Sequence, residues 1–160
     1  MSINNYILFV MKITDIFIAS TFIWVGFIGA ISFMEAWLKF QAPGVTLSIG
    51  LGIGRLVFGA LNKVEWVIAF IIVATFIYLA LDIQNNKQFL IDVGFTFFWV
   101  VCLLLAETFW LLPKLDERAQ LIIAGETLPA NSLHIFFVAA ECLKVVLLIY
   151  FAIQIFHFKQ

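Results

Sequence analysis

Charged residues are scarce in this chain. Asp, Glu, Lys and Arg make up 12% of its 160 residues, against about 25% in an ordinary soluble protein. Hydrophobic residues make up 64%, more apolar surface than a soluble core of this size encloses, so lipid must cover much of it. The formal net charge of -1 removes the electrostatic basis for binding nucleic acid. We therefore expect one domain, residues 1–160, with the lipid bilayer as its partner.

Histidine and cysteine are nearly absent, with two of each. Cys102 and Cys142 fall inside apolar runs, where a thiol behaves as a small hydrophobic group, so no disulfide framework is predicted. His134 and His157 lie roughly 34 Å apart along one predicted helix, too far to ligate one haem iron. Haem is therefore not expected. The first residues also lack a basic stretch and a small-residue cleavage site, so we expect them to be retained rather than removed as a signal peptide.

Long apolar runs are the dominant pattern. Each holds roughly 20 or more residues, enough to cross a hydrocarbon core of about 30 Å. Only helices and closed barrels satisfy their backbone in lipid, and runs of this length favour helices. The predicted fold class is all-α, a polytopic transmembrane four-helix bundle with spans at 13–40, 64–83, 89–112 and 133–156.

The segment 46–62, TLSIGLGIGRLVFGALN, differs from the four runs. It is apolar but rich in glycine, contains Arg55, and is short for a crossing. We predict an interfacial or re-entrant helix between spans one and two, with a fifth crossing as the alternative. No strand precedes its glycines, so they do not form a dinucleotide fingerprint. Gly50 and Gly54 are instead spaced for close helix packing.

Turn residues predict where the other helices begin and end. Pro113 is expected to end the third span, since proline disrupts a helix interior. A short surface helix is predicted over 116–124, stopped by Gly125. Asn131 and Ser132 are suitable N-cap residues for the fourth span.

Four crossings place both termini at one end of the bundle, called here the terminal end. The long connections between spans one and two and between spans three and four then lie at the opposite end, the loop end. Basic residues are more frequent at the loop end, so we expect that end to be cytoplasmic and the termini to lie on the outer, periplasmic side. The loop-end set is Lys39, Arg55, Lys63, Lys114 and Arg118, against Lys12, Lys87 and Lys159.

Ionisable residues from all four spans fall at similar depths in the loop-end half. Because a lone charge in lipid is costly, such residues usually face the interior of a bundle and mark a site or an ion pair. Helical spacing also places Ser32 beside Glu35 on span one, and His134 beside Glu141 on span four. We therefore predict a buried polar network or ligand-binding site formed by Glu35, Glu65, Glu107, His134, Glu141 and Lys144. Trp24 is expected to be a packing residue.

Three interpretations of this network stay open. The residues satisfy one another and set the helix register; or a cation, proton or small molecule enters from the loop end and meets the carboxylates; or a metal is held, as in carboxylate-bridged four-helix bundles, although the usual Glu-x-x-His pairs are absent. The metal set would be Glu35, Glu107, His134 and Glu141, and would serve a membrane-embedded metal-dependent enzyme. We favour a non-enzymatic transport, ligand-binding or accessory component, with a structural subunit of a larger membrane complex or a homo-oligomer as alternatives.

The stretch 111–146 resembles the last third of small four-span bacterial inner-membrane proteins of unassigned function. The matching pieces are Leu112-Pro113, Leu115-Asp116, Arg118, Gly125, Leu133-His134, Glu141 and Lys144. The chain is more distantly similar to copper-resistance D-type membrane proteins, although it lacks the histidine early in the chain that a metal or haem role would require. The resemblance implies a multi-pass fold in a bacterial inner membrane more than any activity.

Overall fold

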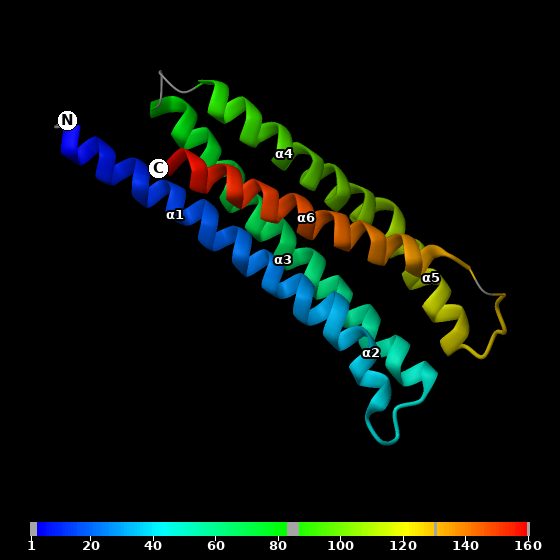
Figure 1. The fold of residues 1–160 in the computed structure, drawn as a ribbon. Coiled ribbons are helices and arrows are strands. Elements are labelled where there is room, and N and C mark those ends of the chain that lie inside the picture. Colours follow the sequence, from blue (N-terminus) through cyan, green and yellow to red (C-terminus); the bar gives the residue numbers. More distant parts are fainter. Residues whose placement is uncertain (1–2, 83–86, 130, 160) are drawn as a thin grey trace.

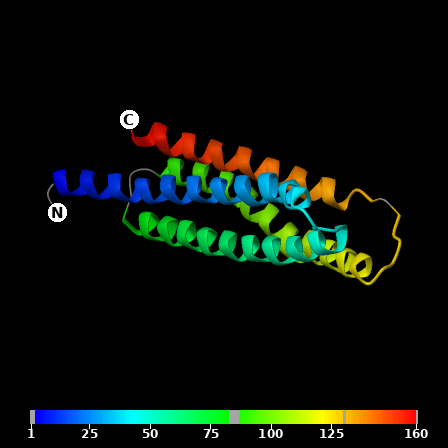
Figure 2. The ribbon, with the colours of Figure 1, turned by 90° about the horizontal axis from the view of Figure 1, so that it is seen from below.

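The structure is a computed structural model that describes the backbone of residues 3–82, 87–129 and 131–159 and the side chains of residues 13–80, 88–129 and 131–157. These residues form helices and loops only. Four helical columns lie side by side along a common direction (Figures 1 and 2). Each contains a stretch long and apolar enough to cross a membrane. The predicted all-α bundle of four spanning helices is confirmed.

The first and third columns are continuous helices with local changes of helix type. The first runs through α1 (Ile3–Ile28), the π-helical segment η1 (Gly29–Glu35), α2 (Ala36–Leu38) and a 3-10 turn, η2 (Lys39–Gln41). The second is α3 (Leu47–Asp82). The third runs through α4 (Lys87–Ala106), the π-helical segment η3 (Glu107–Leu111) and α5 (Leu112–Ile123), and the fourth is α6 (Leu133–Lys159). The N- and C-terminal ends lie at the same end of the bundle, as predicted (Figure 1).

The glycine-rich segment 46–62 does not form the separate helix that the sequence predicted. Instead of a separate interfacial or re-entrant helix, it is the first part of α3, which continues without a break into the span. Two glycines allow the end of the first column to lie directly on it. A Cβ atom on Gly50 would lie 2.1 Å from Cε1 of Phe40, and one on Gly54 would lie 2.9 Å from Nζ of Lys39. This confirms the predicted packing role of both glycines, and tertiary contact offsets their low helix propensity.

The third column passes through Pro113, where the sequence predicted an end. Proline lacks an N–H donor and clashes with the carbonyl group four residues earlier, here that of Phe109. The π-helical segment Glu107–Leu111 lies directly before it. A π-helix pairs residues five apart and so has a wider turn, which lets the column continue to Ile123.

The predicted end of α5 and start of α6 are confirmed. Gly125 has φ +95°, and its N–H donates to the carbonyl of Ile122 at 3.0 Å, while the N–H of Glu126 donates to the carbonyl of Leu121 at 3.0 Å. This pair of bonds is a Schellman motif, for which glycine is the least strained residue. At the start of α6, the side-chain oxygen of Asn131 accepts a hydrogen bond from the N–H of Leu133 at 3.3 Å.

The interior of the terminal-end half is aromatic. One phenylalanine from each column meets there: Phe17 of α1, Phe76 of α3, Phe97 of α4 and Phe151 of α6. The rings of Phe17 and Phe76 have centroids 4.8 Å apart, and those of Phe97 and Phe151 are 5.5 Å apart. Such pairs add about 0.5–1.5 kcal/mol beyond their burial. The buried charged residues of the core lie outside this aromatic region, toward the loop end.

The contact between Gly50 and Phe40 yields a test of the fold. Gly50→Ala displaces the Phe40 ring, whereas Gly52→Ala on the same helix enters open space, because nothing lies within 4 Å of a Cβ at Gly52. We expect the Gly50→Ala protein to be less stable than the Gly52→Ala protein by about 1–3 kcal/mol, measured by SDS-induced unfolding in mixed micelles. Equal stability of the two variants would contradict the packing of η2 on α3.

Candidate functional site: a buried Glu/Lys cluster and an adjoining pocket

Lys144 of α6 is surrounded by three carboxylates from three helical columns. Its Nζ lies 2.6 Å from Oε1 of Glu65 and 3.2 Å from Oε2 of Glu141, and it also forms an ion pair with Glu107. These four residues are called the Glu/Lys cluster below. Each has at most 1% of its surface exposed. The ions are therefore paired inside the bundle, away from its outer surface.

The first column completes the cluster with hydrogen-bond donors. Nε1 of Trp24 donates to Oε1 of Glu65 at 2.8 Å, and Oγ of Ser32 donates to Oε1 of Glu141 at 3.1 Å. Trp24 and Ser32 are both buried. All four columns thus contribute a group, which confines the cluster on every side.

The two π-helical segments lie at the level of the cluster. Ser32 belongs to η1, and Glu107 is the first residue of η3. A π-helical turn rotates the following side chains relative to an unbroken α-helix, and such turns are frequent at functional sites. In this protein the two irregular turns each present a polar group to the same buried cluster.

The cluster contains more acids than bases. Three carboxylates face one ammonium group, so complete ionisation would leave two negative charges in excess inside a low-dielectric bundle, which is costly. Oε1 of Glu107 is buried and has no hydrogen-bond partner in the described part of the chain. The cluster therefore combines a strong central ion pairing with an excess of acidic groups.

Four of the six predicted network residues meet, and Glu35 is one of the two that do not. It pairs instead with Lys39 at 3.1 Å and is only partly buried. The prediction assumed an α-helix, in which Ser32 and Glu35 share a face. Both lie in η1, and in a π-helix residues three apart diverge around the axis. Ser32 therefore reaches the cluster while Glu35 turns away from it.

His134 is the other residue outside the cluster. It lies in the first turn of α6 and is exposed. Its seven-residue spacing from Glu141 places both on one face, but also separates them by about 10 Å along the helix axis. The two side chains therefore share a face of the helix but do not lie close together.

The predicted metal set is not brought together, because Glu35 and His134 both lie outside the cluster. A different trio, Glu65, Glu107 and Glu141, offers oxygens within 4.8 Å of one another. The Lys144 ammonium contacts all three carboxylates, so the cation that these oxygens share is part of the chain. With Lys144 in this position the donor set does not fit a metal ion.

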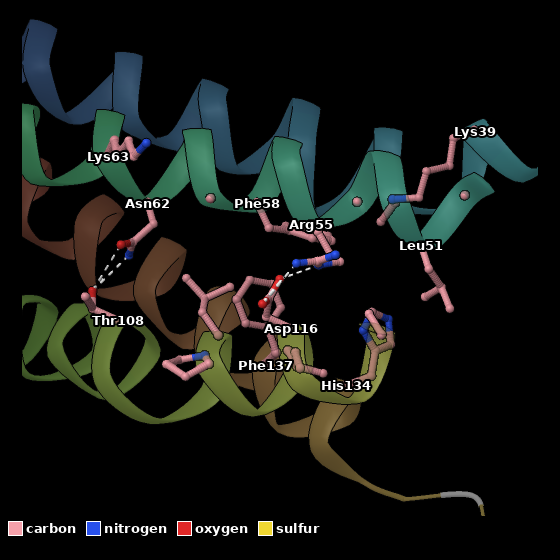
Figure 3. A pocket seen from close by; sticks show the side chains of 18 of the residues that line it. Lys39, Leu51, Arg55, Phe58, Asn62, Lys63, Thr108, Asp116, His134 and Phe137 are labelled. Atoms are coloured by element: carbon pink, nitrogen blue, oxygen red, sulfur yellow. Dashed lines mark hydrogen bonds and ion pairs between the residues drawn. The ribbon is translucent and has the colours of Figure 1, made fainter. Parts of the chain in front are cut away.

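A pocket of about 580 Å³ opens beside the cluster, between α3, α5 and the start of α6. Its lining combines apolar side chains with a few polar ones, as small-molecule sites do. Figure 3 shows Arg55 and Asp116 meeting across it, with Lys39 and His134 at one end and Asn62 and Thr108 at the other. The remaining lining residues are Ala36, Phe40, Gly50, Leu51, Gly54, Phe58, Gly59, Lys63, Leu112, Pro113, Leu115, Ala119 and Phe137.

The inner end of the pocket adjoins the cluster. Nδ2 of Asn62 donates to Oγ1 of Thr108 at 2.9 Å, and Nε1 of Trp66 donates to the same oxygen at 3.0 Å. Thr108 follows Glu107 in the chain, and Asn62 precedes Glu65 by three residues, so both lie within one helical turn of a cluster carboxylate. This pair of polar side chains lines the part of the pocket that lies nearest in the chain to the cluster.

Several site residues escaped the sequence analysis. Trp24 was assigned to packing, because its N–H donor has no signature until Glu65 is placed opposite. The pocket residues Asn62, Arg55 and Asp116 were assigned to connections or helix ends. For Arg55 and Asn62 the available signal was that 46–62 is an apolar segment carrying isolated polar residues.

No protein-family model, curated protein or solved structure matches this chain. The resemblance to four-span bacterial inner-membrane proteins and to the copper-resistance D type therefore stays a prediction. The function must be argued from the site itself.

Removing the central cation tests the Glu/Lys cluster. Lys144→Met leaves three buried carboxylates unpaired and should cost about 3–5 kcal/mol of stability. Glu141→Gln should cost less, because two carboxylates still face the ammonium. Lys114→Met, at an exposed position, should fall within about 0.5 kcal/mol of wild type. SDS-induced unfolding in mixed micelles measures all three.

A second substitution separates charge from packing. Adding Glu107→Gln to Lys144→Met removes one of the stranded charges and should restore part of the lost stability. A double variant that is less stable than Lys144→Met alone would show that shape, not charge, holds the cluster together.

The metal interpretation has its own test. Divalent cations that prefer oxygen ligands, such as Mn²⁺, should leave the unfolding temperature of the wild type unchanged and raise that of Lys144→Met, whose three carboxylates lack a cation. Stoichiometric metal in the purified wild-type protein by elemental analysis would contradict the assignment of Lys144 as the resident cation.

Proposed function

We propose that this protein is a small ligand-binding or transport component of a bacterial inner membrane that takes a small molecule into the pocket at its loop end. The observation that carries the proposal is the pocket itself, about 580 Å³ in volume and within the roughly 300–1,000 Å³ of small-molecule sites. The excess of Lys and Arg at the loop end supports a cytoplasmic position for the pocket and outer termini.

The division of the core supports binding rather than a purely structural role. The terminal-end half is closed by packed aromatic rings and the middle by the Glu/Lys cluster. The loop-end half instead keeps an open volume beside three glycines, Gly50, Gly54 and Gly59. Protein interiors are otherwise packed with few voids larger than a water molecule, so a pocket of this size supports a binding role.

A pocket-filling variant tests the proposal. Gly59 lines the pocket, and a Cβ there meets nothing within 4 Å, so Gly59→Leu places a side chain in the open volume. Gly52→Leu is the matched control, because Gly52 lies on the same helix, also faces open space and does not line the pocket. The probes are tritium-labelled dodecanoate, dodecanol and dodecylamine, with the protein in phosphatidylcholine nanodiscs and empty nanodiscs as background.

We expect at least one probe to bind wild type and Gly52→Leu at about one per chain, and Gly59→Leu to bind it at least tenfold more weakly, since the added side chain competes for the same volume. Binding of no probe above background, or equal binding to all three proteins, would refute a ligand pocket. Native mass spectrometry of the same samples counts the chains per assembly and so tests the oligomer and complex-subunit alternatives.

A further inference from the structure

We propose that the ligand of this pocket is a single-chain amphiphile with an acidic head group, a long-chain carboxylate or a molecule of the same chemistry. The inference rests on the proposed function and adds the chemical class of the ligand. It is based on the charges, the apolar surface and the volume of the pocket.

The charges lining the pocket are mostly positive. Lys39, Arg55 and Lys63 line it against one carboxylate, that of Asp116. Lys39 shares its charge with Glu35, which leaves an excess of one positive charge when that partner is counted. An anion entering the pocket therefore improves its charge balance, whereas a cation worsens it.

Arg55 is placed to receive an acidic head group. Its Nε and Nη2 donate to the two carboxylate oxygens of Asp116 across the pocket. A guanidinium has five N–H donors, so three stay available to a second acceptor. Charge-assisted hydrogen bonds of this kind are about twice as strong as neutral ones, and Figure 3 places Lys39 and His134 at the same end of the pocket.

The rest of the lining suits an alkyl chain. The rings of Phe58 and Phe137 pack edge to face with centroids 5.2 Å apart, and Leu51, Leu112 and Leu115 extend the apolar surface. Lys39 lies over the Phe58 ring, with Nζ 5.1 Å from its centroid, so a positive group stands at the edge of this apolar surface. A cation beside an apolar surface is the arrangement that a charged head group attached to an alkyl chain requires of its binding site. The volume is that of an ordinary small-molecule site, which favours one chain over a two-chain lipid.

Head-group selectivity tests the class of ligand. Dodecanoate, dodecanol and dodecylamine share one chain and differ in charge. We expect wild type in phosphatidylcholine nanodiscs to bind dodecanoate at least about tenfold more tightly than either other probe, the factor one charge-assisted contact supplies. The preference should shrink as salt is raised, because ions screen a partly exposed site. Equal or tighter binding of dodecanol or dodecylamine would overturn the acidic head group and leave the proposed function intact, whereas binding of no probe defeats both.

Two substitutions at the ion pair separate ligand binding from structure. Arg55→Gln removes the head-group donor and should weaken dodecanoate binding about tenfold while leaving dodecanol unchanged. Asp116→Asn removes the competing carboxylate and should strengthen dodecanoate binding, because Arg55 is released to the ligand. Both variants break the same ion pair, so loss of binding in both would show that the pair only holds the pocket in shape and would overturn the role of Arg55.

A competition experiment identifies the source of the acid. Phosphatidylglycerol offers a negative head group on two chains, and nanodiscs containing it should leave bound dodecanoate in place. Displacement of dodecanoate by phosphatidylglycerol would overturn the single-chain assignment in favour of a membrane lipid.

Discussion

An ammonium group inside an apolar bundle is the constraint on which this structure depends. Lys144 has no exposed surface, and a buried charge without a partner costs several kcal/mol. Its partners come from α3, η3 and α6, and the first column adds donors to two of those carboxylates. Rotating any column about its own axis would remove a group from the cluster, so the ion cluster restricts the rotation and register of all four helices in a way that interchangeable apolar side chains do not.

The pocket lies at the loop end of the core, away from the packed aromatic rings. Toward the termini, the four phenylalanines from the four columns leave a filled interior. Toward the loops, α3, the continuation of α5 beyond Pro113 and the start of α6 surround an open volume. Asn62 and Thr108 line this volume within one helical turn of Glu65 and Glu107. The pocket and the cluster thus lie at successive levels of the core.

Much of the site was predictable because depth in a membrane follows from residue counting. Glu65, Glu107 and Glu141 come from three different spans, and Lys144 shares the span of Glu141. Their positions along those spans place them at one level, and a charge facing lipid is costly, so they are expected to face the interior. Two predictions were wrong for the same reason: that Glu35 joins the network, and that the third span ends at Pro113. Each depends on a π-helical turn, η1 or η3, and helical periodicity counted at 3.6 residues per turn is blind to such a turn. The separate helix predicted at 46–62 was wrong because the contacts of Phe40 and Lys39 with glycines lie outside any local pattern.

The amino-acid sequence by itself determined that the chain is helical, that four stretches are long and apolar enough to cross a membrane, and that both termini share one end. These properties depend on the length and apolar composition of each run and on the number of runs, which can be read directly from the sequence. Only the tertiary structure decided which acids surround Lys144, that Trp24 and Ser32 complete their hydrogen bonds, and that Arg55 faces Asp116 across a pocket. Such pairings depend on how far each helix is rotated about its axis, and a single wide turn changes that rotation for every residue that follows it.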